Sequence, residues 1–96
     1  MTKEIVIQVL RAVTEESFIK YNAHIRGIFG SIARGDAREN SDVDVLVDFT
    51  ENADLFDYVG LELFLEEKLN RRVDVVPRDT IRSEIRNAVI KEAIYI

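Results

Sequence analysis

The sequence contains no cysteine and a single histidine, His24, so it cannot form disulfide bonds, thiolate metal sites or imidazole zinc clusters. Any bound metal ion must therefore have oxygen ligands. No apolar run approaches the ~18 residues that a membrane span needs, and residues 1–4 lack the basic and then apolar pattern of a secretion signal. These absences predict a soluble, cytoplasmic protein that has no membrane partner.

Positive charge is also scarce, because the sequence has 13 Lys and Arg against 18 Asp and Glu, which gives a formal net charge of -5. Broad nucleic-acid binding draws on clustered basic residues that neutralise phosphates, so nucleic acid is not expected as a direct ligand. The 96 residues, 47% of them hydrophobic, can build one core but leave no room for a second domain. We therefore expect a single domain over residues 1–96.

Hydrophobic periodicity predicts the first half of the fold. Apolar residues recur at intervals of three and four over residues 3–21, which predicts one helix with a buried stripe. Residues 24–29 predict a short strand that stops at Gly30, and Ser31 then opens a helical turn. Residues 34–41 are polar and contain glycine, which is typical of a loop.

The second half of the predicted fold begins with a strand over residues 43–49, whose valines alternate with Asp42, Asp44 and Asp48. Leu46 interrupts this alternation, which indicates that part of the acidic face is covered.

Three further elements complete the fold. They are a helix over 54–69 entered at Asn52 or Asp54, a strand over 72–76 ended by Pro77, and a last helix entered at Asp79 or Thr80. The resulting order, α-β-α-β-α-β-α, predicts an α/β (α+β) fold with a small mixed β-sheet of three or four strands flanked by helices.

A phosphate site is predicted where the first strand ends. A glycine at a strand end lets the backbone approach a ligand closely, and the exposed amides of the following helical turn attract anions. Gly30 and Ser31 can therefore cradle triphosphate oxygens, with the Ser31 hydroxyl as an extra donor. Arg34 and Arg38 lie on the loop that follows and are candidates to steady an outgoing pyrophosphate, with simple solvation of both side chains as the competing interpretation.

Three carboxylates form the predicted metal and catalytic site. Asp42 and Asp44 lie one residue apart on one strand face, so their oxygens can converge on a hard cation such as Mg²⁺. Asp74 stands between valines on a later strand, which turns it toward the acidic face if the strands are neighbours. Without a cation the three carboxylates repel one another, and at least one should hold a proton. Two magnesium ions could then support an in-line displacement at an α-phosphate, with Asp74 helping to deprotonate the acceptor hydroxyl.

Each feature also has a simpler interpretation. The Gly-Ser pair suits an ordinary strand-to-helix turn, and the two aspartates of the second strand suit a solvated strand face. Asp74 is harder to explain without a function, because an aspartate inside a Val-Asp-Val-Val strand works against strand propensity and burial. An ion pair with Arg71 or Arg72 is the structural alternative for this residue, and His24 is expected to have no role in the site.

The combined pattern resembles a known superfamily. Gly30-Ser31, ten intervening residues, then Asp42-Val43-Asp44 and a later strand carboxylate at Asp74 resemble the nucleotidyltransferases that include the palm of polymerase beta. The fuller string GSIARGDARENSDVDVLVDF, residues 30–49, is similar to the minimal nucleotidyltransferases, or MNT proteins. The resemblance implies a palm-like fold in which the Gly-Ser pair contacts nucleotide phosphates and the three aspartates bind magnesium.

The resemblance also implies a function. MNT proteins of this kind are antitoxins paired with HEPN-domain toxins, which are RNases, and they transfer AMP from ATP to a toxin tyrosine. This implies a magnesium-dependent nucleotidyltransferase, with ATP as its substrate and a HEPN toxin as its partner. Larger relatives carry added domains that hold tRNA, DNA or an antibiotic, and this chain ends soon after its last predicted helix, so we expect a partner to share the acceptor site.

Two other functions stay open. The chain could be a non-catalytic module that neutralises its partner by contact alone, or it could transfer a nucleotidyl group to a small hydroxylated molecule, for which a homodimer would complete the pocket. Apolar positions near the carboxyl end exceed what one helix stripe needs, and they predict an interface: Ile90, Ile94, Tyr95 and Ile96.

Overall fold

The computed structural model describes residues 1–96 and contains a four-stranded mixed sheet with the strand order β3-β2-β1-β4. β1 runs antiparallel to both of its neighbours, β2 and β4, whereas β2 and β3 are parallel. The strands are β1 (Ala23–Phe29), β2 (Val43–Phe49), β3 (Val73–Pro77) and β4 (Ile94–Tyr95). This architecture confirms the predicted fold class, a small mixed sheet flanked by helices.

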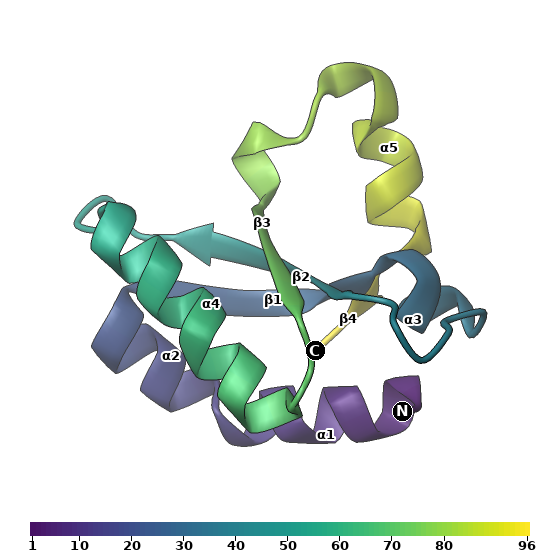
Figure 1. The fold of residues 1–96 in the computed structure, drawn as a ribbon. Coiled ribbons are helices and arrows are strands. Elements are labelled where there is room, and N and C mark those ends of the chain that lie inside the picture. Colours follow the sequence, from purple (N-terminus) through teal and green to yellow (C-terminus); the bar gives the residue numbers. More distant parts are fainter.

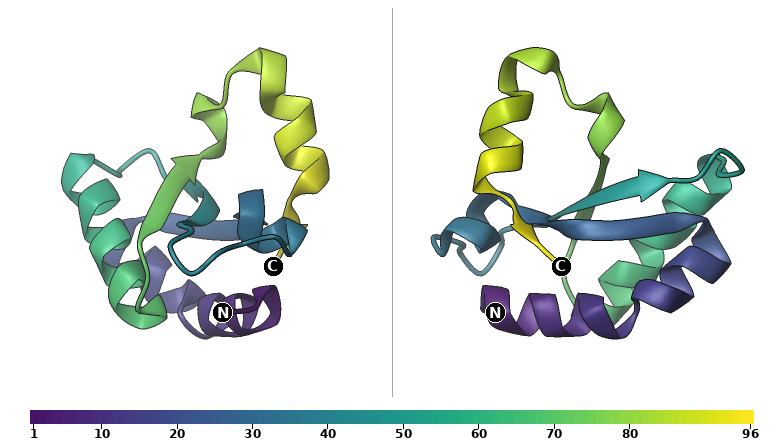
Figure 2. Two further views of the ribbon diagram at one scale, coloured as in Figure 1. Left: turned by 45° about the vertical axis from the view of Figure 1, so that its right-hand side comes forward. Right: turned by 180° about the vertical axis from the view of Figure 1, so that it is seen from behind.

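Helices cover the two faces of the sheet unequally (Figure 1). In two further views α1, α2 and α4 lie on one face, whereas α5 rises from the other (Figure 2). The helices are α1 (Lys3–Ala12), α2 (Thr14–Tyr21), α3 (Gly30–Arg34), α4 (Leu55–Leu69), the 3₁₀ turn η1 (Arg78–Thr80) and α5 (Ser83–Glu92). None of them combines the length and the apolar character that a membrane crossing requires.

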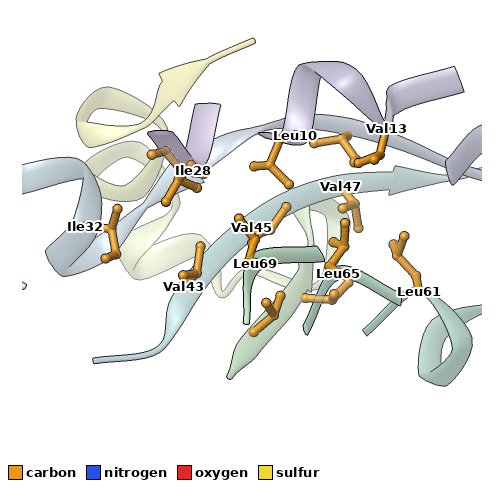
Figure 3. Packing of buried hydrophobic residues seen from close by; sticks show 14 of the residues in the cluster. Leu10, Val13, Ile28, Ile32, Val43, Val45, Val47, Leu61, Leu65 and Leu69 are labelled. Atoms are coloured by element: carbon orange, nitrogen blue, oxygen red, sulfur yellow. The ribbon is translucent and has the colours of Figure 1, made fainter. Parts of the chain in front are cut away.

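The main hydrophobic core fills the space between the sheet and the helices α1, α2 and α4 (Figure 3). Val43, Val45 and Val47 of β2 are fully buried there. They meet a stripe of leucines spaced four residues apart on α4, namely Leu61, Leu65 and Leu69. Because strand side chains alternate between the two faces, Asp44 and Asp48 point to the opposite face, toward α5.

Part of that opposite face is covered as well. Leu46 is fully buried although it shares the face of the aspartates, and it lies outside the main core cluster. Ile81, which follows η1, is likewise buried outside that cluster, and η1 lies against β2. The covered patch that Leu46 predicts on the acidic face is therefore confirmed.

The single helix predicted over residues 3–21 is wrong, because the chain leaves helical geometry at Val13 and forms two helices. The Thr14 hydroxyl donates to the Arg11 carbonyl at 3.1 Å. In a continuous helix that carbonyl would accept from the amide of residue 15, so the Thr14 side chain competes with the helical ladder. Burial nevertheless continues across the break through Val13 and Ser17.

The last helix begins later than predicted. The Thr80 hydroxyl donates to the Pro77 carbonyl at 2.8 Å, so this threonine closes the η1 turn and does not cap a helix. Ile81 follows in an extended conformation with its side chain buried. α5 therefore begins only at Ser83, and Arg82 at its N-cap position makes no side-chain hydrogen bond.

The cap of α4 agrees with one of the two predicted options. The Asp54 carboxylate accepts from the Asp57 amide at 3.0 Å, and the Asp57 carboxylate accepts in return from the Asp54 amide at 3.1 Å. This reciprocal capping box satisfies two amides that would otherwise lack partners at the start of the helix.

The predicted element order omits β4. Ile94 and Tyr95 pair with β1, and the Ile96 amide donates to the Arg26 carbonyl at 2.9 Å. A Cβ at Gly27 would collide with the backbone of Ile94, so this glycine permits the close pairing. Ile94 and Ile96 are half-buried against the core, whereas Ile90 and Tyr95 are exposed, so the interface predicted for these four residues stays a prediction that Ile90 and Tyr95 support best.

Candidate active site

Two aspartates lie side by side at the end of the sheet where β1 stops and β2 and β3 begin. Asp44 is the register partner of Asp74 in the parallel ladder, and of Phe29 in the antiparallel one. Asp44 is half-buried, whereas Asp74 is exposed on an edge strand. Because register partners point to the same face of a sheet, both carboxylates lie on the side opposite the core valines.

Gly30 begins α3 immediately after β1 and has a φ of 73°, in the left-handed region that favours glycine. A Cβ at this position would collide with Oδ2 of Asp44 and would lie 3.2 Å from its Cγ. Both the backbone conformation and the proximity of the carboxylate therefore require glycine. Gly30 of the predicted Gly-Ser turn and Asp44 are thus adjacent in space, although 13 residues separate them in the sequence (31–43).

Burial raises the pKa of Asp44 to about 6, and repulsion from Asp74 and Asp42 adds to the rise, while Arg34 opposes it. The charged form of Asp44 is therefore disfavoured when no cation is bound. Crowding of the carboxylates is predicted to favour protonation of at least one of them, and Asp44 is the member whose pKa moves in that direction. A cation placed between the carboxylates would reverse the shift.

Asp42 precedes β2 and is exposed, and its negative charge acts on Asp44. As the side chains stand, no group of three or more carboxylates is arranged to hold a metal ion. Mg²⁺ is usually held by one or two protein carboxylates together with waters and substrate phosphates. The oxygen-only donors of Asp42, Asp44 and Asp74 are of the kind this ion takes, and their role as ligands stays a prediction.

Ser31 and Arg34 extend the group from α3. Ser31 is half-buried directly after Gly30. The Arg34 guanidinium is exposed and contacts Asp36 at 3.3 Å and Glu92 at 3.4 Å. It is also near enough to Asp44 to lower the pKa of that carboxyl. Arg34 is therefore positioned beside the aspartates, with both of its ion pairs open to solvent.

Arg38 and Arg71 organise the loop before β2. The Arg38 amide donates to the Ser41 hydroxyl at 2.8 Å, and Arg71 Nη1 donates to the carbonyls of Arg38 and Ser41 at 3.2 and 3.1 Å. Neither Arg71 nor Arg72 forms an ion pair with Asp74. The ion-pair explanation of Asp74 is therefore wrong, and its exposed carboxylate has no cationic partner within the chain.

Two side chains of α4 hold β3 on either side of Asp74. Glu66 Oε2 accepts from the Val73 amide at 3.1 Å, and the Tyr58 hydroxyl donates to the Val75 carbonyl at 2.9 Å. These bonds occupy backbone groups of an edge strand and fix the segment that carries the carboxylate. The sequence carries no signal for these contacts, because helical spacing does not reveal which strand a polar side chain will meet.

Asp48, the third aspartate of β2, belongs to a different group. It accepts from Nε of Arg78 at 2.8 Å and from Nε of Arg26 at 2.7 Å. The hydrogen bond from Arg78, supported by the one from Arg26, lowers the pKa of Asp48 to about 2. Its carboxylate is therefore committed to joining β1, β2 and η1, which distinguishes it from the unpaired Asp44 and Asp74.

Comparison with known proteins links this arrangement to a family. A family model described as a nucleotidyltransferase domain matches residues 10–96. The protein adenylyltransferase MntA of Thermococcus cleftensis is 38% identical over 96 residues, which make up 100% of this chain and 97% of that protein.

Solved structures agree with this match. One that is provisionally named a minimal nucleotidyltransferase is 38% identical with a TM-score of 0.82, over 100% of this chain and 97% of that chain. A crystal structure of a toxin–antitoxin with AMP-PNP shares the fold, with a TM-score of 0.69 at 21% identity over 99% of this chain and 72% of that chain. The chain therefore belongs to the nucleotidyltransferase family, as the motif of residues 30–49 predicts.

Proposed function

We propose that this nucleotidyltransferase transfers AMP from ATP to a hydroxyl group of a partner protein, namely a tyrosine of a HEPN-domain toxin. The observation that carries the proposal is the pairing of Asp44 with Asp74 beside the Gly30 turn. Support comes from the relative named a protein adenylyltransferase, and from the toxin–antitoxin structure of similar fold that contains an ATP analogue.

The residues of the site fit magnesium. Asp44 and Asp74 present neighbouring carboxylates that form no ion pair. Burial, together with repulsion from Asp74 and Asp42, raises the pKa of Asp44 although Arg34 opposes the rise. Asp42, Asp44 and Asp74 would hold the ions, with triphosphate oxygens as further ligands. Bound magnesium, in one or two sites, would neutralise charge that develops on the phosphates during transfer.

The residues of this chain then have distinct roles in the transfer. The absence of a side chain at Gly30 leaves room for the Asp44 carboxylate beside the start of α3. The Ser31 hydroxyl would donate to a phosphate oxygen. The acceptor oxygen attacks the α-phosphorus, and its proton passes to the exposed carboxylate of Asp74. The bond from the α-phosphorus to the bridging oxygen of the β-phosphate breaks, and pyrophosphate leaves.

Basic side chains around the site would attract the triphosphate and steady the leaving group. Arg34 lies near Asp44 in weak, solvent-exposed ion pairs that a phosphate can replace. Arg38 lies on the loop before β2, where a hollow of about 360 Å³ is lined in part by Arg71 and Arg72. These guanidiniums offset the net negative charge of the chain where an anionic substrate must approach.

The test is a transfer assay with ATP labelled on its α-phosphate. The purified protein would be incubated with labelled ATP, MgCl₂ and the HEPN toxin, in parallel with Asp44→Ala and the matched surface variant Asp79→Ala. Label should appear on the toxin with the wild type and Asp79→Ala, and a toxin tyrosine should be identified by mass spectrometry. Label should be absent with Asp44→Ala or with excess EDTA.

Three results would contradict the proposal. Equal labelling by Asp44→Ala and the wild type would remove the proposed role of the aspartate pair. Absence of label in every sample, although wild type and Asp44→Ala both neutralise the toxin, would indicate an antitoxin that acts by contact alone. Release of a labelled small molecule would instead point to a small hydroxylated acceptor.

A further inference from the structure

The outer face of α4 carries an exposed apolar patch, which we call the α4 outer patch and define as Leu55, Phe56, Val59 and Leu63. Their exposed fractions are 74%, 86%, 45% and 61%. Leu55, Val59 and Leu63 follow one another at intervals of four, and Phe56 lies one turn before Val59, so the four side chains share one side of the helix. The opposite side of α4 already supplies three buried leucines to the core, so the patch is a second apolar stripe that the fold does not use.

Carboxylates lie at both ends of the α4 outer patch. Glu51 and Asp54 are exposed just before it, and Glu67 is exposed just after it, with the half-buried Glu62 and Glu66 beside it. The helix contains one basic residue, Lys68, whose ammonium lies 5.4 Å from the centre of the Phe64 ring. On a helical wheel Lys68 falls well away from the patch, toward the side that faces α2. An apolar surface framed by negative charge therefore remains without a partner.

The helix that carries the patch is hydrogen-bonded to β3, the strand that carries Asp74. Glu66 and Tyr58 of α4 form hydrogen bonds with Val73 and Val75, the two residues that flank Asp74. The carboxylate of Glu62, on the same helix, lies near enough to Asp74 to be affected by its charge. A protein resting on the outer face of α4 would therefore lie next to the edge strand whose exposed aspartate is proposed to take the acceptor proton.

The carboxylates around the α4 outer patch indicate which kind of protein surface can bind it. Two copies of this chain packed through α4 would bring carboxylates of one copy against carboxylates of the other, in either helix direction, and like charges across an interface are destabilising. A partner surface with Lys or Arg around an apolar centre would be attracted instead. The face of a helix offers no free backbone groups for strand addition, so the complementary element is another helix.

We infer that the α4 outer patch is the surface on which the acceptor protein docks, through an amphipathic helix whose apolar stripe is flanked by Lys or Arg. The inference rests on the proposed protein adenylylation, because it takes the HEPN toxin to be the docked protein. Docking there would hold the acceptor protein against the helix that borders β3, the edge strand of Asp74, and would supply specificity that the small site around Asp44 does not provide.

The test compares toxin binding and AMP transfer by patch variants. Phe56→Ser combined with Leu63→Ser should weaken toxin binding about tenfold or more in calorimetry. A few large side chains that become buried on binding carry most of the binding free energy of such interfaces. The same variant should raise the KM for toxin by a similar factor with little change in kcat. Glu67→Lys should slow association about threefold and reduce its dependence on salt. Ile85→Ser is the matched control, because Ile85 is 52% exposed on α5 at the other face of the sheet.

The outcomes separate the docking surface from the chemistry. Asp44→Ala should bind the toxin like the wild type and fail only in transfer, so loss of transfer with intact binding concerns the proposed function alone. Circular dichroism of each variant would verify that it is folded. Wild-type binding by the Phe56 and Leu63 double variant, or no toxin binding by the wild type, would overturn the inference. A wild-type dimer that this double variant dissociates without change in toxin affinity would also overturn it, in favour of an interface between copies.

Discussion

Asp44 faces Asp74 across the parallel ladder between β2 and β3, and neither carboxylate has a basic partner in an ion pair. Two neighbouring negative charges, one of them half-buried, lower the stability of the metal-free protein. The arrangement is therefore useful for binding a cation and unfavourable for folding. Such conflicts are expected at functional sites.

Replacing Asp44 by Asn should stabilise the metal-free protein while abolishing AMP transfer. Because the folded-state pKa of about 6 lies above the unfolded value, the destabilisation by Asp44 is complete above pH 6 and disappears as the pH falls through about 4. After allowance for solvent screening, we expect a gain of about 1 kcal/mol at pH 8, or about 4–8 °C in Tm.

Thermal unfolding in EDTA at pH 8 and at pH 4 would measure this gain for Asp44→Asn, with Asp79→Asn as the control. The gain should be present at pH 8 and absent at pH 4. An Asp44→Asn variant less stable than the wild type at pH 8 would show that repulsion is not the dominant effect at this position.

Gly30→Ala should impair both stability and transfer, because alanine there is strained and also collides with Asp44. The same change at Gly35 introduces the strain alone and therefore separates the two effects. Gly30 and Gly35 both have positive φ, 73° and 83°, so alanine is strained at either position by about 1 kcal/mol. Only at Gly30 does the added methyl collide with the Asp44 carboxylate, whereas nothing lies within 4 Å of a Cβ at Gly35.

Both alanine variants should therefore lose about 1 kcal/mol in urea unfolding, and Gly30→Ala more than that. Only Gly30→Ala should lose more than about tenfold in transfer rate, because it displaces the carboxylate that we propose as a metal ligand. Similar transfer by the two variants would mean that the contact between Gly30 and Asp44 has no functional importance.

Features supported by several residues at once could be predicted from the sequence. The alternating valines of β2 predicted its buried face, its acidic face and, through Leu46, the covered part of that acidic face. Asp74 was predicted to join the acidic face because it alternates with Val73 and Val75, and the register of β2 and β3 places it opposite Asp44. These predictions hold because the alternation of apolar and acidic residues is repeated along the strand, so that one residue that departs from it does not change the assignment of the faces.

Features that depend on one side chain could not be predicted in the same way. One hydrogen bond from Thr14 accompanies the break at Val13, and one from Thr80 accompanies the late start of α5. β4 is two residues long and therefore has no periodicity of its own. The contact between Glu66 and β3 joins residues whose proximity exists only after folding.

Gly27→Ala should detach β4 from the sheet. The added methyl would meet the carbonyl group of Ile94 and the Cα of Tyr95, which are backbone atoms that cannot rotate away. Hydrogen exchange should therefore accelerate at the Ile96 amide, which donates to Arg26, while the amides of β2 that pair with β1 keep their protection. Unchanged exchange at Ile96 would show that the edge of the sheet accommodates the methyl group.

Asp48 should stabilise the folded protein at neutral pH and lose this contribution as the pH falls, whereas Asp44 destabilises the metal-free protein at neutral pH. Its hydrogen bonds from Arg78 and Arg26 lower its folded-state pKa to about 2, below the unfolded value of about 3.9. The stability that it contributes is therefore fully present above pH 4 and is lost as the pH falls through 2. Because the pair is partly exposed, we expect Asp48→Asn to cost about 1 kcal/mol at pH 7.

Unfolding of four proteins by urea at pH 7 and at pH 2 would measure this contribution: the wild type, Asp48→Asn, Arg78→Met and the double variant. The coupling energy between Asp48 and Arg78 should be clear at pH 7 and reduced at pH 2, because protonated Asp48 no longer attracts the guanidinium. A coupling that is equal at both pH values would mean that packing of Arg78 against the sheet, and not its charge, holds η1 in place. Transfer activity at pH 7 should change far less than in Asp44→Asn, since Asp48 is bound to Arg26 and Arg78 and lies outside the proposed site.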